Sequence, residues 1–128
     1  MKAVACLAVA LSAAVSLSVA AQQAERPRIN PADLPGRQVF AAQCAPCHGA
    51  GRGDDGSHSL PGTEALARKY AGALPGELER RSDLPAPLLR LFVRRGAGAM
   101  PAFRPSELTD AEIVAIADYL AATAQRSR

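Results

Sequence analysis

Apolar residues recur at helical spacing most regularly near the C-terminus of the chain. Thr109 is followed three residues later by Glu112, which is the spacing of a capping box at the start of a helix. Beyond this cap, one apolar face repeats with a period close to 3.6 residues. The pattern therefore predicts an amphipathic helix that begins at Thr109, and its apolar face consists of Ile113, Ile116, Tyr119 and Leu120.

A shorter helical pattern occupies residues 33–44. We expect this helix to be capped near Asp33 and to end before Pro46, because proline cannot donate a backbone hydrogen bond inside a helix. Its apolar positions are Leu34, Val39 and Phe40.

The middle of the chain predicts further helices. Residues 63–71 have apolar positions four apart and are followed by the stop signal Gly72. Residues 75–81 are expected to add one turn. Residues 83–95 carry two prolines in the first turn, where proline is tolerated best, and end before a glycine. The predicted apolar face of this last helix consists of Leu84, Leu88, Leu91 and Phe92.

No segment alternates apolar and polar residues as a half-buried strand would. Glycine and proline gather in residues 49–62 and 96–107, which we predict to be loops. A chain of 128 residues holds one ordinary domain. The sequence therefore predicts an all-α protein of about four to five short helices.

The first 21 residues form a separate apolar segment that begins with a basic residue and ends in small residues. This is the pattern of a secretory signal peptide cut after Ala21, and we expect export to the periplasm. The alternative is an uncleaved membrane anchor, but three serines and many alanines make the segment weakly hydrophobic. Cleavage would remove Cys6 and leave Cys44 and Cys47 as the cysteines of the mature protein.

We therefore divide the chain into a signal peptide (1–21), a flexible segment (22–32), a domain (33–124) and a C-terminal tail (125–128). The formal net charge is +3, and the chain has two Tyr, three Phe and no Trp. So few aromatic residues cannot supply stacking platforms for bases, and nucleic acid is not an expected partner. With so few aromatic residues the hydrophobic core is small, and a bound group would help to complete it.

The mature cysteines belong to the sequence Cys44-Ala45-Pro46-Cys47-His48, which has the C-x-x-C-H spacing of covalent haem attachment. Two thiols three positions apart at a helix end can form thioether bonds to two vinyl groups on one edge of a porphyrin. The adjacent imidazole of His48 is then turned beneath the ring, where it can bind the iron. We predict one haem c at this motif.

Three alternatives use the same residues. A Cys-x-Pro-Cys redox site needs a strand-rich context that this sequence lacks. A zinc site needs four ligands, and only His58 could join Cys44, Cys47 and His48. A structural disulfide with a bystander histidine is the third.

The expected sixth ligand of the iron is Met100, the one methionine after the leader. A methionine in a hydrophobic core normally belongs to a helical apolar stripe, whereas Met100 lies between Gly98 and Pro101 in a loop. A thioether suits a low-spin haem iron. His58, in a polar loop, is the alternative.

These residues resemble the class I c-type cytochromes, the small soluble bacterial family, over about residues 34–122. Gly36, Phe40 and residues 44–49 look like the first helix and haem motif of that family, and the Met100 loop looks like its methionine-ligand loop. The end of the chain resembles the family's C-terminal helix at Ile116, Tyr119 and Leu120.

The resemblance implies helices wrapped around one covalently bound haem c, with one haem edge exposed for electron exchange. It implies that Gly36 lets the first and last helices approach closely. It also implies that the Pro61 carbonyl accepts a hydrogen bond from the second ring nitrogen of His48.

On this basis we expect an electron carrier, not an enzyme, whose iron cycles between Fe(III) and Fe(II) with His48 and Met100 as axial ligands. Redox proteins are the expected partners, with a dehydrogenase as donor and an oxidase or another cytochrome as acceptor. No small-molecule substrate is expected, and a membrane only if the leader is kept. The alternatives are the cytochrome subunit of a periplasmic dehydrogenase complex, or a haem peroxidase or gas-binding protein with a labile sixth ligand.

A basic rim of arginines would steer an acidic partner toward the haem edge. The alternative is an arginine-rich surface that only meets solvent. The candidates for the rim are Arg80, Arg81, Arg94, Arg95 and Arg104.

Overall fold

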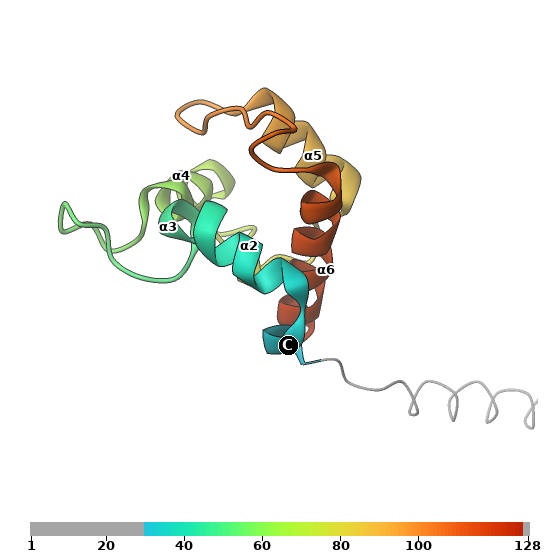
Figure 1. The fold of residues 1–128 in the computed structure, drawn as a ribbon. Helices are drawn as coiled ribbons and strands as arrows, with labels where there is room; N and C mark the ends of the chain where they lie inside the picture. The colour runs from blue at the N-terminus through green and yellow to red at the C-terminus, as the bar shows by residue number, and fades with distance from the viewer. Residues whose placement is uncertain (1–29, 127–128) are drawn as a thin grey trace, which may run out of the picture.

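The computed structural model describes residues 30–126. Within this range the one β pairing is an isolated bridge between Ala97 and Met100, so the predicted all-α class is confirmed. Figure 1 shows the helices in chain order. They are η1 (Pro31–Asp33), α2 (Pro35–Gln43), α3 (Ala45–His48), α4 (Pro61–Tyr70), η2 (Leu78–Arg80), α5 (Ala86–Arg95) and α6 (Asp110–Arg126).

Helices α2 and α6 pack directly against each other, which joins the two ends of the domain (Figure 1). Gly36 lies at the crossing and is buried. A Cβ atom added to Gly36 would lie 1.9 Å from the carbonyl oxygen of Ala115 and 2.8 Å from the backbone nitrogen of Ile116. No side chain fits there, and the close approach expected at Gly36 is confirmed.

The core lies between α2, α5 and α6. All four residues of the stripe predicted for the last helix are buried, and Ile113 and Leu120 are fully inaccessible to solvent. They pack with residues of the other two helices and of the segment before α6, namely Phe40, Leu89, Val93 and Leu108.

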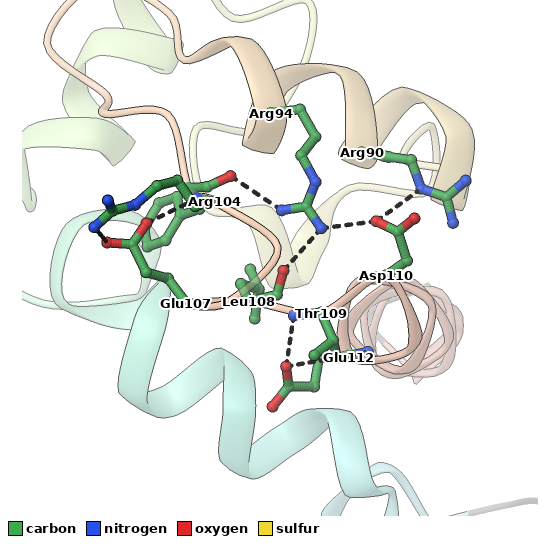
Figure 2. A network of polar contacts seen from close by, with 9 residues as sticks. Arg90, Arg94, Arg104, Glu107, Leu108, Thr109, Asp110 and Glu112 are labelled. Atoms are coloured by element: carbon green, nitrogen blue, oxygen red, sulfur yellow. Dashed lines mark hydrogen bonds and ion pairs between the residues drawn. The ribbon is translucent and has the colours of Figure 1, made fainter.

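The predicted capping box of α6 is also present (Figure 2). The backbone N–H of Glu112 donates to Thr109 Oγ1 at 3.2 Å, and the N–H of Thr109 donates to Glu112 Oε2 at 2.7 Å. Two N–H groups without partners in the helix ladder are thereby satisfied.

The start of α2 differs from the prediction. Asp33 is not its cap, because it forms the last residue of η1, and Leu34 takes the N-cap position without a side-chain hydrogen bond. Pro35, the first residue of α2, needs no cap for its backbone nitrogen, because it has no N–H. The side chain of Asn30 caps η1, where its Oδ1 accepts a hydrogen bond from the backbone N–H of Ala32 at 3.2 Å.

Two other helices also begin at a different residue from the predicted one, and in both a proline lies at the start. Helix α4 begins at Pro61 instead of Thr63, and α5 begins at Ala86 instead of Asp83. Pro61 occupies the first turn, whereas Pro85 is extended and stands just outside its helix. Proline at either place leaves the helix ladder intact.

The two ends of the folded part lie further out than the sequence predicted. Pro31 is buried, so residues 30–32 belong to the fold and not to a flexible segment. Helix α6 continues to Arg126, whose Nη2 donates to Asn30 Oδ1 at 2.9 Å, so the predicted tail does not begin at residue 125. The predicted signal peptide, 1–21, lies outside the described residues. Among residues 30–126, no helix is both long and apolar enough to cross a membrane.

Candidate haem-binding site

The C-x-x-C-H motif forms a tight turn where α2 ends and α3 begins. Pro46 has no N–H, so it cannot continue the hydrogen-bond ladder of α2. Instead, the N–H groups of Cys47 and His48 both donate to the carbonyl oxygen of Cys44, at 3.1 and 2.8 Å. The turn therefore places two thiols and one imidazole on a single short helix of four residues and its N-cap.

Both cysteines are free thiols, so the structural disulfide weighed for this motif is not formed. Cys44 is half-buried and Cys47 is exposed. Burial, and secondarily the nearby Cys47, raises the pKa of Cys44 to about 11. Redox-active thiols have a lowered pKa, and Cys44 therefore lacks that property.

His48 is held with one ring nitrogen facing inward. Its Nδ1 atom is buried and has no hydrogen-bond partner among the described residues. Burial lowers the pKa of His48, which favours the neutral imidazole that binds metals. An inward Nδ1 leaves Nε2 as the nitrogen for an iron atom.

The neighbour of this ring is Gly62, in the first turn of α4. A Cβ on Gly62 would lie 2.6 Å from His48 Cε1 and 2.8 Å from Nδ1. The expected hydrogen bond from His48 Nδ1 to the carbonyl oxygen of Pro61 is not formed here. Pro61 instead opens α4 as its first residue, and its part in the site is to start the helix that covers the imidazole.

A buried hydrogen bond fixes α4 against the motif. Thr63 Oγ1 donates to the carbonyl oxygen of Gly49 at 2.9 Å, and Thr63 is only 5% exposed. Gly49 follows His48 directly, so this bond joins α4 to the end of the C-x-x-C-H motif. The sequence interpretation did not identify Gly62 or Thr63, although a glycine and a threonine after Pro61 were a visible signal of close packing.

Met100 lies in a closed turn between α5 and α6. The N–H of Ala97 donates to the carbonyl oxygen of Met100 at 3.1 Å, and the N–H of Met100 donates back to the carbonyl oxygen of Ala97 at 3.0 Å. Gly96, with φ of 69°, makes this turn possible, because a Cβ there would lie 2.6 Å from the Met100 carbonyl oxygen. Met100 is half-buried and packs against the hydrophobic core.

The structure brings the haem motif and the methionine loop to the same side of the core. Cys44 and Met100 both contact the core cluster of residues. An open depression of about 380 Å³ is lined both by the residue before Cys44 and by residues after Met100. The lining residues are Gln43, Pro101, Ala102, Phe103 and Glu107.

Helix α5 has two apolar faces, and the structure corrects which of them meets the helical core. The buried residues of α5 are Leu89 and Val93. Of the predicted face, Leu84 stands before the helix and packs against the core, whereas Leu88 and Phe92 are half-buried and Leu91 is 42% exposed. Leaving such a face in water is costly, and a large flat apolar group would cover it. Together with the free thiols and the unpartnered buried nitrogen of His48, this face fits a haem.

The alternative ligands do not gather around the motif. His58 is exposed in the loop between α3 and α4. Within residues 30–126 there is no group of three or more His, Cys, Asp or Glu side chains that could hold a metal ion, so the zinc alternative has no counterpart.

The predicted basic rim is wrong for Arg81 and Arg94, whose side chains are largely buried and bind other groups of the protein, whereas Arg80, Arg95 and Arg104 are exposed. Arg81 is 4% exposed, bonds both carboxylate oxygens of Asp83 and lies 4.7 Å from the centre of the Tyr70 ring. Arg104 pairs with Glu107. Arg94 bonds the loop after Met100, a role that the sequence interpretation did not find.

These features define a class, that of a small all-α c-type cytochrome with one haem-attachment motif. Residues 31–120 match the family model described as cytochrome c oxidase, cbb3-type, subunit III, and the chain belongs to this family of cytochrome c domains. Cytochrome c6 of Picosynechococcus sp. is 34% identical over 93 residues, which cover 73% of this chain and 74% of that protein. No solved structure matches the chain. The protein is thus a small class I c-type cytochrome, which carries covalently bound haem c and takes part in electron transfer.

Proposed function

We propose that this cytochrome is a periplasmic electron carrier in which His48 and Met100 are the two axial ligands of one haem c. Bound haem c supplies a one-electron Fe(III)/Fe(II) couple. The chain holds the two ligands in fixed places, and ligands that do not move keep the reorganisation on electron transfer small. Its partners would be redox proteins that dock at an exposed haem edge.

The observation that carries this proposal is the closed turn around Met100. A methionine that only fills a core has no need of two reciprocal backbone hydrogen bonds and a glycine at positive φ beneath its carbonyl. At the C-x-x-C-H motif, the imidazole of His48 lies against Gly62, and the hydrogen bond of Thr63 to Gly49 fixes α4 in place. Each ligand therefore has its own support from the backbone.

The Met100→Ala variant tests the ligand assignment. The unmodified ferric protein should show the weak far-red absorption of iron bound to thioether sulfur, and the variant should lack it. The variant should also bind cyanide much faster. Ser106→Ala, exposed in the same loop, is the matched control and should leave both properties unchanged. Equally fast cyanide binding by the unmodified protein would favour the gas-binding or peroxidase alternative.

Location is tested separately from ligation. Expression of the full chain in bacteria should yield, in the osmotic-shock fraction, a protein whose mass equals residues 22–128 plus one haem. A product that keeps residues 1–21 and sediments with membranes would favour the anchor.

A second candidate function is that of a permanently bound subunit of a larger redox complex. The family model favours it to the extent that its description names an oxidase subunit. The dehydrogenase subunit considered from the sequence belongs to the same class of function. Co-purification of a larger redox-active chain in fixed stoichiometry would support this candidate, whereas a monomeric haem protein in gel filtration would support the free carrier.

A further inference from the structure

Arg94 stands in the last turn of α5, two residues before the loop that carries Met100. Its guanidinium makes three hydrogen bonds, all to residues that follow Met100 in the chain (Figure 2). Nη1 donates to the carbonyl oxygen of Phe103 at 3.1 Å, and Nη2 donates to the carbonyl oxygen of Leu108 at 2.8 Å. Nη2 also reaches Asp110 Oδ1 at 2.7 Å.

These bonds fix the segment that follows the turn around Met100. Phe103 is held at both of its backbone groups, because its N–H donates to the carbonyl oxygen of Val93 at 2.8 Å while Arg94 binds its carbonyl. Phe103 follows Met100 by three residues, and Gly96 begins the turn on the other side. The position of Met100 is therefore set between the end of α5 and a residue that Arg94 holds.

The bond to Leu108 fixes the far end of the same loop. Leu108 is 1% exposed and belongs to the core cluster. A guanidinium presents donors in a planar fork and can serve two carbonyls at once, whereas an ammonium group is a compact point charge. The arrangement therefore requires arginine.

The ion pair with Asp110 is the weaker part of the arrangement. The Asp110 side chain is 57% exposed and is shared with Arg90 Nε at 3.4 Å. Exposed ion pairs contribute little to stability, whereas hydrogen bonds from a charged donor to protein carbonyls contribute more. The two carbonyl bonds are thus the part that restrains the loop.

We infer that Arg94 is the positioning residue for the sixth ligand: its fork fixes Phe103 and Leu108, and this restraint holds the Met100 thioether in place. The inference rests on the proposed function, in which Met100 is that ligand. Loss of the fork should let the loop open and should weaken ligation without touching the haem motif.

The test uses the haem-loaded protein and four variants. Arg94→Ala removes the fork, and Arg94→Lys keeps a positive charge without the fork. Arg95→Ala is the matched control, because Arg95 lies in the same turn, is exposed, and its side chain makes no hydrogen bond or ion pair with the rest of residues 30–126. Asp110→Asn removes the ion pair and keeps both carbonyl bonds. Helicity and haem content are measured for each variant.

Both Arg94 variants should lose far-red absorption and should bind cyanide roughly tenfold faster or more, the size expected from losing hydrogen bonds of a charged donor. Amide hydrogens of Met100 and Phe103 should exchange faster in both variants. Arg95→Ala and Asp110→Asn should match the unmodified protein.

Each other outcome has a definite meaning. If the far-red band is present in the unmodified protein and survives in both Arg94 variants with unchanged cyanide binding, the positioning role is overturned and Met100 ligation stands. Absence of the band from the unmodified protein overturns the ligand assignment and with it the inference. If Arg94→Ala does not fold, Arg94→Lys decides between these results. A change in Asp110→Asn as large as in Arg94→Lys would assign the effect to the ion pair and overturn the role of the fork.

Discussion

The Gly62→Ala variant should disturb His48, the proposed axial ligand, with little change elsewhere. In the folded protein the new Cβ would lie 2.6 Å from His48 Cε1 and 2.8 Å from both Nδ1 and the carbonyl oxygen of Cys47. Real Cβ atoms essentially never approach other heavy atoms closer than 3.0 Å, and ordinary contact begins at 3.4 Å. Either the imidazole or α4 must therefore move by several tenths of an ångström.

Overpacking of this kind costs about 1–3 kcal/mol. Alanine is a better helix former than glycine by up to about 1 kcal/mol, which offsets part of that cost. The net loss should be about 1–2 kcal/mol, which for a domain of this size lowers the melting temperature by roughly 4–16 °C. Because the strain falls on the proposed axial ligand, the reduction potential and the ligand-field spectrum should shift as well.

Gly36→Ala provides the matched comparison, since both glycines directly follow the proline that begins a helix. Its Cβ would lie 1.9 Å from the Ala115 carbonyl oxygen, at the α2–α6 crossing and not at the haem motif. This variant should lose about 3 kcal/mol or more by forcing α2 and α6 apart, yet any folded fraction should keep a normal spectrum. Thermal unfolding and potentiometry of both variants check the expectation. An unchanged potential and spectrum in Gly62→Ala would refute the argument that Gly62 supports the imidazole.

Two further predictions concern the last helix. Burial, together with the hydrogen bond to Glu79, raises the pKa of Tyr119 to about 12. An unfolded tyrosine titrates near 10, so this tyrosine contributes stability below about pH 10 that is lost as the pH rises through about 12. Tyr119→Phe should cost about 1 kcal/mol at neutral pH and should flatten that alkaline loss, as measured by urea unfolding at several pH values; an identical alkaline decline in both proteins would contradict it. Thr109→Ala should cost about 1 kcal/mol by removing the cap of α6, whereas Thr109→Ser should keep the cap. Equal urea midpoints for the two Thr109 variants would show that the capping box does not contribute.

The haem motif and the last helix could be predicted because their signals are local. The spacing from Cys44 to His48 fits the geometry of one porphyrin edge, and the cap at Thr109 precedes an apolar repeat that nothing interrupts. Neither depends on where the rest of the chain goes. The same holds for Met100, whose position between a glycine and a proline is by itself incompatible with a helical core stripe.

Helix starts were harder to predict because a proline near the start of a helix decides which residue begins the helix. Asp33 has the right side chain for a cap, yet Pro35 sets where α2 begins and places Asp33 in the preceding turn. In α5, which of the two apolar faces is buried also depended on where α6 packs against it. Leu89 and Val93 face α6, and the other face has a pattern that is just as apolar.

By itself, the sequence determined the class of protein, and it predicts the covalent attachment residues and the candidate axial ligands, because each follows from residue types at short, fixed spacings. Only the tertiary structure decided which residues contact and support the proposed ligands. Gly62 against His48 and Arg94 against Phe103 are contacts between segments 9 to 14 residues apart. The internal hydrogen bonds of Arg81 and Arg94 likewise distinguished these structural arginines from exposed ones. A side chain's type gives the bonds that it can make, but which partner it finds depends on how the chain folds.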